Sequence, residues 1–164
     1  MEFNTLKFPL PGKGEMRNFQ FLIFVTVLAL APLCSARDVA VITDKSNGTS
    51  AVASADLLKL LKTDMQHWPD GRKVTIFLND PGSADVRLMF QKVYNMSPDE
   101  ARKFVDAHKG NIMVMNGDEM VVKAVAQLPG SIGLVNVYSL NSSVKVMRVD
   151  GKLPLEQGYL LHGN

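Results

Sequence analysis

The chain has 164 residues, of which 46% are hydrophobic and 21% are charged, and its formal net charge is +2 at pH 7. This length and composition are typical of a globular protein with a single domain. Because the net charge is small and no run of Lys or Arg forms a patch, the sequence argues against nucleic acid or an anionic membrane surface as the partner.

The N-terminal part of the chain has the pattern of a secretory signal peptide. Arg17 precedes an apolar run at residues 19–30, and small residues follow as far as Ala36. We therefore predict that residues 1–36 are an upstream extension plus a signal peptide, with Met16 as the natural start, and that residues 37–164 are the exported domain. The apolar run is short for a membrane span, so an uncleaved anchor is the minor alternative.

The single cysteine, Cys34, falls within the predicted signal peptide. The exported domain would then contain no disulfide and would depend on its hydrophobic core, which a domain of this size can build. Pro32 and Leu33 are poor residues for the processing site of a lipoprotein, so we do not expect lipidation. These features favour a bacterial periplasm as the location.

Strand and helix patterns alternate along residues 37–164, which predicts an α/β fold with a mixed or parallel sheet. Ser54 is expected to cap the first helix. In the last helix Met120, Val121, Val125 and Leu128 are expected to form the apolar face. The expected helices span 55–62, 84–94, 98–108 and 118–127, and the expected strands span 39–43, 74–78, 131–137 and 144–149, while 109–115 is either a strand or an irregular connection.

The stretch from 74 to 94 carries the clearest sign of a binding site. An apolar strand runs into the turn Asn79-Asp80-Pro81-Gly82, and Ser83 is a good N-cap for the helix that follows. Such a turn leaves backbone N–H groups free at the start of the helix, where they can bind an anion. Arg87 lies one helical turn further along the same face, where its guanidinium can reach the same anion.

Each of these features also has a plainer interpretation. Residues 82–87 can be an ordinary turn with a cap and a solvated arginine. The polar loop 44–50, which also follows a strand and precedes a helix, is either a second set of ligand donors or a surface loop. His67, His108 and His162 have no metal-binding spacing, and Ser83 has no base that the sequence reveals. We therefore expect no metal, no cofactor and no enzymatic activity.

Several segments together resemble the phosphate-type substrate-binding proteins of ABC transporters. These segments are the first helix, the turn Trp68-Pro69-Asp70-Gly71, the strand and turn with Pro81-Gly82-Ser83 and Arg87, and the entry Pro129-Gly130-Ser131-Ile132-Gly133 to a late strand. The resemblance covers most of residues 39–150. It implies a single lobe of the type 2 periplasmic-binding-protein fold, with a mixed sheet flanked by helices, because the chain is too short for the two lobes of that family.

The resemblance also implies a ligand site at Gly82, Ser83, Ala84, Asp85 and Arg87. The usual run of the family is Gly-Ser-Gly-Thr-Arg. In this chain Ala84 replaces a glycine, Asp85 replaces a threonine, and Val86 is an extra residue before the arginine. Asp85 can accept a hydrogen bond from a protonated oxyanion, whereas it repels a fully ionised one.

Two hypotheses follow for the function. In the first, the exported domain binds phosphate or a similar small oxyanion for ABC transport, with a membrane transporter or an envelope protein as partner. In the second, the domain has lost ligand binding and is a protein-interaction module of the periplasm. The sequence leaves the identity of the anion, the oligomeric state and the source of a second lobe open.

Overall fold

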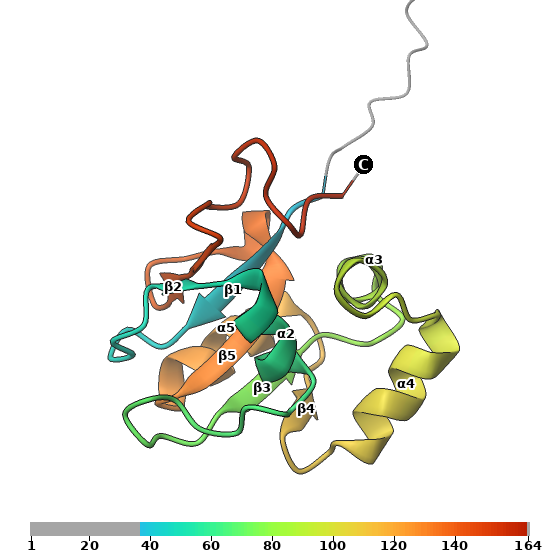
Figure 1. Cartoon of the computed structure of the whole chain (residues 1–164), viewed down its shortest axis with the longest axis horizontal. Coiled ribbons are helices and arrows are strands. Elements are labelled where there is room, and N and C mark those ends of the chain that lie inside the picture. Colours follow the sequence, from blue (N-terminus) through green and yellow to red (C-terminus); the bar gives the residue numbers. More distant parts are fainter. Residues whose placement is uncertain (1–36, 164) are drawn as a thin grey trace, which may run out of the picture. The chain divides into compact units, whose positions relative to one another are not determined.

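The computed structural model describes residues 37–163, and the predicted signal peptide lies outside the described residues. Its centre is a five-stranded sheet with the strand order β4-β3-β5-β1-β6 (Figure 1). These strands are β1 Val39–Thr43, β3 Thr75–Leu78, β4 Ile112–Val114, β5 Ser131–Asn136 and β6 Lys145–Val146. Within residues 37–163, no helix combines the length and the hydropathy that a membrane span needs.

The sheet is mixed because β1 runs against its neighbours. β3 is parallel to β4 and to β5, whereas β1 is antiparallel to β5 and to β6. Val39 at the start of β1 is therefore opposite Asn136 at the end of β5. As a result, the first residues of β1 lie beside the C-terminal ends of β3 and β5. The α/β class with a mixed sheet is confirmed.

Apolar side chains alternate between the two faces of the sheet, as the pleat of a strand requires, and each face has its own core. On one face Val41, Ile76 and Leu134 belong to a cluster with residues of three helices, which are α2 Ser54–Leu61, α3 Ala84–Met89 and α4 Pro98–Ala107. On the other face Ile42 and Phe77 pack with α5 Asp118–Gln127. Helices thus flank both faces, as expected.

The start of α2 differs from the sequence-based prediction. Ala53, and not Ser54, is the N-cap, and no side chain of the cap residue accepts a hydrogen bond. The backbone N–H of Ser54 instead donates to Oδ1 of Asp150 at 2.8 Å. The prediction was wrong because a residue almost a hundred positions away supplies the acceptor that a local side chain normally provides.

The segment after β3 forms three consecutive helical pieces. Ser83 caps α3 as predicted, because its side chain accepts a hydrogen bond from the N–H of Val86. Residues Phe90–Tyr94 continue as a π-helical turn, η1, which ends at Asn95 with a positive φ of 53°. Ser97 and Glu100 then form a capping box at the start of α4.

Helix α5 begins and ends where the sequence predicts, but its buried face is displaced. Val121, Val122 and Val125 are buried, whereas Met120 is 48% exposed and Leu128 is 40% exposed. Of the four residues expected on the apolar face, Val121 and Val125 are therefore buried, whereas Met120 and Leu128 are not. Branched side chains of three valines fill the face that packs on the sheet, and the two longer side chains remain at its margin.

The C-terminal part of the chain is more irregular than predicted. The expected strand at 144–149 is divided into β6 and β7 Arg148–Val149, with the buried Met147 between them. β7 pairs in parallel with β2 Ala51–Val52, a short strand that the sequence analysis missed. The final segment returns to the start of β1 (Figure 1), where the N–H of Val39 donates to the carbonyl of Leu161 at 3.0 Å. Tyr159 and Leu161 are buried there.

Candidate functional site

The turn after β3 is attached to the neighbouring strand end through Asn79. The side-chain Nδ2 of Asn79 donates to Oδ1 of Asp118 at 3.0 Å, and its Oδ1 accepts from the N–H of Gly117 at 3.2 Å. Oδ2 of Asp118 in turn accepts from the N–H of Asn136 at 2.8 Å. Side-chain hydrogen bonds therefore hold the C-terminal ends of β3 and β5 to the start of α5.

Two of the backbone N–H groups that the sequence assigned to an anion already have partners within the turn. The N–H of Gly82 donates to Oδ1 of Asp80 at 2.5 Å, and the N–H of Ser83 donates to the carbonyl of Asp80 at 2.8 Å. The carboxylate of Asp80 thus occupies part of the position that an external anion would take. Within residues 37–163, the N–H groups of Ala84 and Asp85 at the first two helical positions have no such partner.

Asp85 faces the end of β5. Nδ2 of Asn136 lies 3.4 Å from both carboxylate oxygens of Asp85. The side chain of Asp85 is therefore directed toward the C-terminal end of β5, where Asp118 also forms a hydrogen bond. Two carboxylates in this region oppose a fully ionised oxyanion on this side of α3, although Asp118 itself is engaged by three hydrogen-bond donors.

Arg87 lies on a different side of α3, in a hollow of about 580 Å³. Ala84 and Arg87 are the two predicted site residues that line it, whereas Gly82, Ser83 and Asp85 are outside the lining. The other walls are the η1 turn, the start of α4 and the two ends of the described chain. The lining consists of Arg37, Ala84, Arg87, Leu88, Phe90, Gln91, Asn95, Met96, Ser97, Pro98, Ala101 and Gly163.

Arg37 is a cation of this hollow that sequence analysis missed. It is exposed, as is Arg87, and among residues 37–163 no carboxylate forms an ion pair with either arginine. No local pattern in the sequence could have identified Arg37. Arg37 reaches the site because β1 is antiparallel to β5. The residue before β1 therefore lies beside the C-terminal ends of β3 and β5.

The first and last described residues, Arg37 and Gly163, are hydrogen-bonded to each other beside the hollow. The N–H of Gly163 donates to the carbonyl of Arg37 at 2.5 Å. A Cβ atom at Gly163 would lie 2.6 Å from that carbonyl oxygen and 3.0 Å from Cδ2 of Leu88. Only a glycine fits this close approach of residue 163 to the backbone of Arg37 and to Leu88 of α3.

Arg102 of α4 is a second cation near the turn that the sequence analysis did not single out. A Cβ atom placed on Gly82 would lie 3.3 Å from Nη2 of Arg102 and 2.9 Å from Oδ1 of Asp80. Arg102 also forms an exposed ion pair with Asp99 at 3.7 Å. The turn is thus flanked by an acidic side chain, Asp80, and a basic one, Arg102. The lining of the hollow, in contrast, contains two arginines and no acidic residue.

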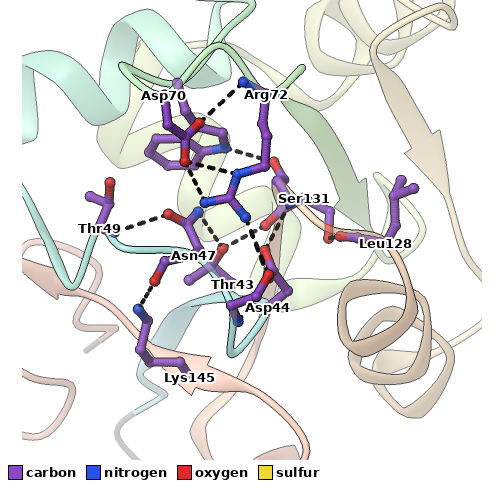
Figure 2. A network of polar contacts seen from close by, with 12 residues as sticks. Thr43, Asp44, Asn47, Thr49, Asp70, Arg72, Leu128, Ser131 and Lys145 are labelled. Atoms are coloured by element: carbon purple, nitrogen blue, oxygen red, sulfur yellow. Dashed lines mark hydrogen bonds and ion pairs between the residues drawn. The ribbon is translucent and has the colours of Figure 1, made fainter.

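The loop at 44–50, the other candidate for ligand donors, is engaged in a buried network (Figure 2). Oγ1 of Thr43 donates to the carbonyl of Ser131 at 2.7 Å, and Nδ2 of Asn47 donates to Oγ1 of Thr43 at 2.9 Å. Oδ2 of Asp44 accepts from the N–H of Gly130 at 2.8 Å. These polar groups hold the loop to the start of β5 and are not directed toward solvent.

The pKa of Asp44 reflects this network. Burial acts to raise it, but hydrogen bonds from the hydroxyl and N–H of Ser46 and from the N–H of Gly130, together with the charge of Arg72, outweigh burial and lower the pKa below its ordinary value. Nε1 of Trp68 donates a hydrogen bond to the carbonyl of Gly130 at 2.7 Å. This region of the fold therefore stabilises the turn at Gly130.

The three histidines have separate surroundings. Nδ1 of His108 lies 2.8 Å from the carbonyl of Phe104, Nδ1 of His162 lies 2.5 Å from Oδ1 of Asp38, and His67 forms an isolated bridge with Lys73. In the part of the chain that the structure describes, no three His, Cys, Asp or Glu residues gather closely enough to hold a metal ion.

No protein-family model matches the sequence, and a comparison with curated proteins finds no match. Solved structures do match the fold. An ABC-type phosphate transport receptor from Vibrio cholerae superposes with a TM-score of 0.66 at 14% identity, over 78% of this chain and 54% of the receptor. PstS from Borrelia burgdorferi has a TM-score of 0.66 at 16% identity, over 79% of this chain and 55% of PstS.

A third similar structure is a putative phosphate ABC transporter substrate-binding protein with bound phosphate from Clostridium perfringens. Its TM-score is 0.59 at 18% identity, over 71% of this chain and 46% of that protein. The described chain therefore shares its fold with part of each of these three proteins, as the resemblance implied. This chain spans about half the length of the first two structures, and the proteins that it resembles are transport binding proteins rather than enzymes.

Proposed function

We propose that this chain is an exported binding lobe that holds a small, phosphate-like oxyanion at the start of α3, without catalysing a reaction. The observation that carries the proposal is that Arg37 and Arg87 line one hollow together with Ala84, the first residue of α3. In open α/β sheets, ligands bind outside the carboxyl ends of parallel strands. One wall of the hollow, Arg37, precedes β1 beside the ends of β3 and β5.

The surroundings of the turn set the affinity that we expect. The N–H groups of Gly82 and Ser83 are engaged by Asp80, so Ala84, Asp85 and the arginines provide the remaining donors. A single lobe leaves the anion in contact with water, and a site of that kind binds weakly unless another surface covers it. A membrane transporter or an envelope protein in the periplasm would supply that surface and would give the lobe a role in ABC transport.

The alternative is a protein-interaction module without a small ligand. The internal contact of Asp80 with Gly82 favours it, because the protein's own carboxylate already satisfies the N–H that an anion would use. Asp85 adds a second negative charge near the turn. Under this alternative the arginines of the hollow would contact acidic groups of a protein partner.

A thermal-unfolding titration of residues 37–164 with phosphate, sulfate and molybdate at matched ionic strength tests the proposal. A ligand that binds only the native state raises the melting temperature with the logarithm of its concentration. We expect a rise for one anion that Arg87→Ala and Arg37→Ala each reduce. The matched control is Lys123→Ala, which removes one exposed positive charge from α5 on the opposite face of the sheet.

Equal and small shifts for all three salts would exclude the anion site and leave the interaction module. A specific shift that Arg102→Ala abolishes and Arg87→Ala does not would move the anion to the turn at Gly82, because Nη2 of Arg102 lies near that glycine.

A further inference from the structure

The hollow beside α3 is much larger than an inorganic oxyanion. Its volume is about 580 Å³, whereas the five heavy atoms of a phosphate ion, at the liquid volume of water, occupy roughly 150 Å³. The volume is within the range of sites for small organic molecules, which is roughly 300–1,000 Å³. A phosphate group next to Arg37 and Arg87 would therefore leave most of the hollow free.

The lining of the remaining space is largely apolar. Leu88 and Met96 are partly exposed on it, and the buried residues Phe90 and Ala101 form its base. The cations and the carboxamides of Gln91 and Asn95 provide the polar contacts. A ligand that fits this division has an anionic head and an apolar body, because each part then meets groups of matching polarity.

The turn itself disfavours a bare phosphate ion as the best ligand. Its Gly82 and Ser83 N–H groups are already engaged by Asp80, and the carboxylate of Asp85 is directed to the sheet edge beside it. Few donors remain for an oxyanion that must be surrounded on all sides. An oxyanion with an organic substituent needs fewer donors, because the substituent esterifies one oxygen in a monoester or replaces it in a phosphonate, and contacts apolar side chains instead.

We propose that the hollow binds an organic phosphate monoester or phosphonate, with its anionic group at Arg37 and Arg87 and its apolar substituent against Leu88 and Met96. This inference rests on the proposed function, since it specifies the class of ligand for the same oxyanion site. It assigns Arg37, Leu88 and Met96 to a binding role that the sequence pattern did not indicate.

The test compares dissociation constants of residues 37–164 for inorganic phosphate, methylphosphonate, phenylphosphonate and benzyl alcohol by calorimetry at matched ionic strength. Methylphosphonate and phenylphosphonate share the head group and differ in the apolar body. We expect phenylphosphonate to bind about tenfold more tightly than methylphosphonate, since partial burial of a ring contributes about that factor. Benzyl alcohol, which has the ring without the charge, should bind at least tenfold more weakly than phenylphosphonate.

Two variants separate the two parts of the site. Met96→Gln should weaken phenylphosphonate binding much more than methylphosphonate binding, because the polar side chain of similar length no longer provides an apolar contact for the ring. Arg37→Gln should weaken both phosphonates by a similar factor. The side chain of Arg37 is exposed, so this variant keeps the fold, which an unchanged melting temperature without ligand would verify.

The outcomes distinguish this inference from the proposed function. Equal affinities for the two phosphonates and for inorganic phosphate would overturn the inference and leave the oxyanion site in place. Binding of phenylphosphonate without binding of inorganic phosphate would support the inference and restrict the proposed function to organic anions. Failure of all three anions would overturn both, and equal binding of benzyl alcohol and phenylphosphonate would overturn the inference because the arginines would then have no effect.

Discussion

Asp44 shows how a single buried side chain holds the loops of this fold in position. Its carboxylate is 3% exposed and accepts hydrogen bonds from the N–H groups of Gly130 and Ser46 at 2.8 and 3.0 Å, while Nη1 of Arg72 lies 3.9 Å from Oδ1. Burial acts against the charged form, but these contacts lower the pKa below the ordinary value of 3.8. The ionised form therefore stabilises the native state at neutral pH.

We predict that Asp44→Ala lowers the free energy of unfolding at neutral pH by about 1–3 kcal/mol, since the N–H of Gly130 loses its partner in a buried position. A folded-state pKa below the unfolded value contributes stability above the unfolded pKa, and that contribution is lost as the pH falls through the folded pKa. The difference between wild type and variant should therefore shrink below about pH 3.8.

Urea denaturation at neutral pH and in acid measures this difference. Asp106→Ala is the control, because Asp106 forms only an exposed pair with Lys109, and its effect should stay within about 0.5 kcal/mol. A loss of stability in Asp44→Ala that is the same at both pH values would show that the charge of the carboxylate does not contribute.

At the scale of elements, the packing of α5 on the sheet depends on a glycine in the central strand. Gly133 of β5 is next to Ile42 of β1 in the sheet. A Cβ atom at Gly133 would lie 2.8 Å from Cγ1 of Val121 and 2.8 Å from Cγ2 of Val125. The branched side chains of α5 thus occupy the space above this glycine, and the helix lies closer to the sheet than any larger residue would allow.

Gly133→Ala should therefore lower the free energy of unfolding by about 1–3 kcal/mol, because the added methyl group displaces α5. Thermal or chemical denaturation measures the change. Gly48→Ala is the matched control, since nothing lies within 4 Å of a Cβ atom there. If the two variants have the same stability, the contact of α5 with β5 is looser than the structure indicates.

At the scale of the whole molecule, the C-terminal segment connects the last residues of the chain with its first strand. The side chain of Leu161 is fully buried, and the hydroxyl of Tyr159 donates to the carbonyl of Val39 at 2.9 Å. Because Gly163 and Arg37 both line the candidate hollow, the same closure also positions a cation of the proposed site. Fold stability and site geometry are thus coupled at the chain ends.

Leu161→Ala should lower the free energy of unfolding by about 2–5 kcal/mol, since it removes buried methyl groups and leaves a cavity. Leu155→Ala is the control within the same segment, because Leu155 is 65% exposed. Differential scanning calorimetry of both variants measures the two effects. A small effect of Leu161→Ala would mean that the C-terminal segment is dispensable for the core.

Much of the fold could be predicted because its signals are local. The capping box of Ser97 and Glu100 acts within four residues, and the cap at Ser83 acts within one helical turn. The errors arose where a distant residue replaced the local signal. Asp150 provides the acceptor for the start of α2, and the sheet selects the valines of α5 in preference to Met120.

The candidate site divides in the same way. Periodicity and turn residues were sufficient for the α/β class and for the placement of the turn at Gly82, because contacts between near neighbours determine these features. They left a mixed and a parallel sheet open, and the mixed sheet was implied by the resemblance alone. The antiparallel placement of β1 brought Arg37 beside Arg87, and the turn directed Asp80 onto Gly82. Which groups remain available to a ligand depends on contacts between segments far apart in the chain, and only the folded molecule establishes those contacts.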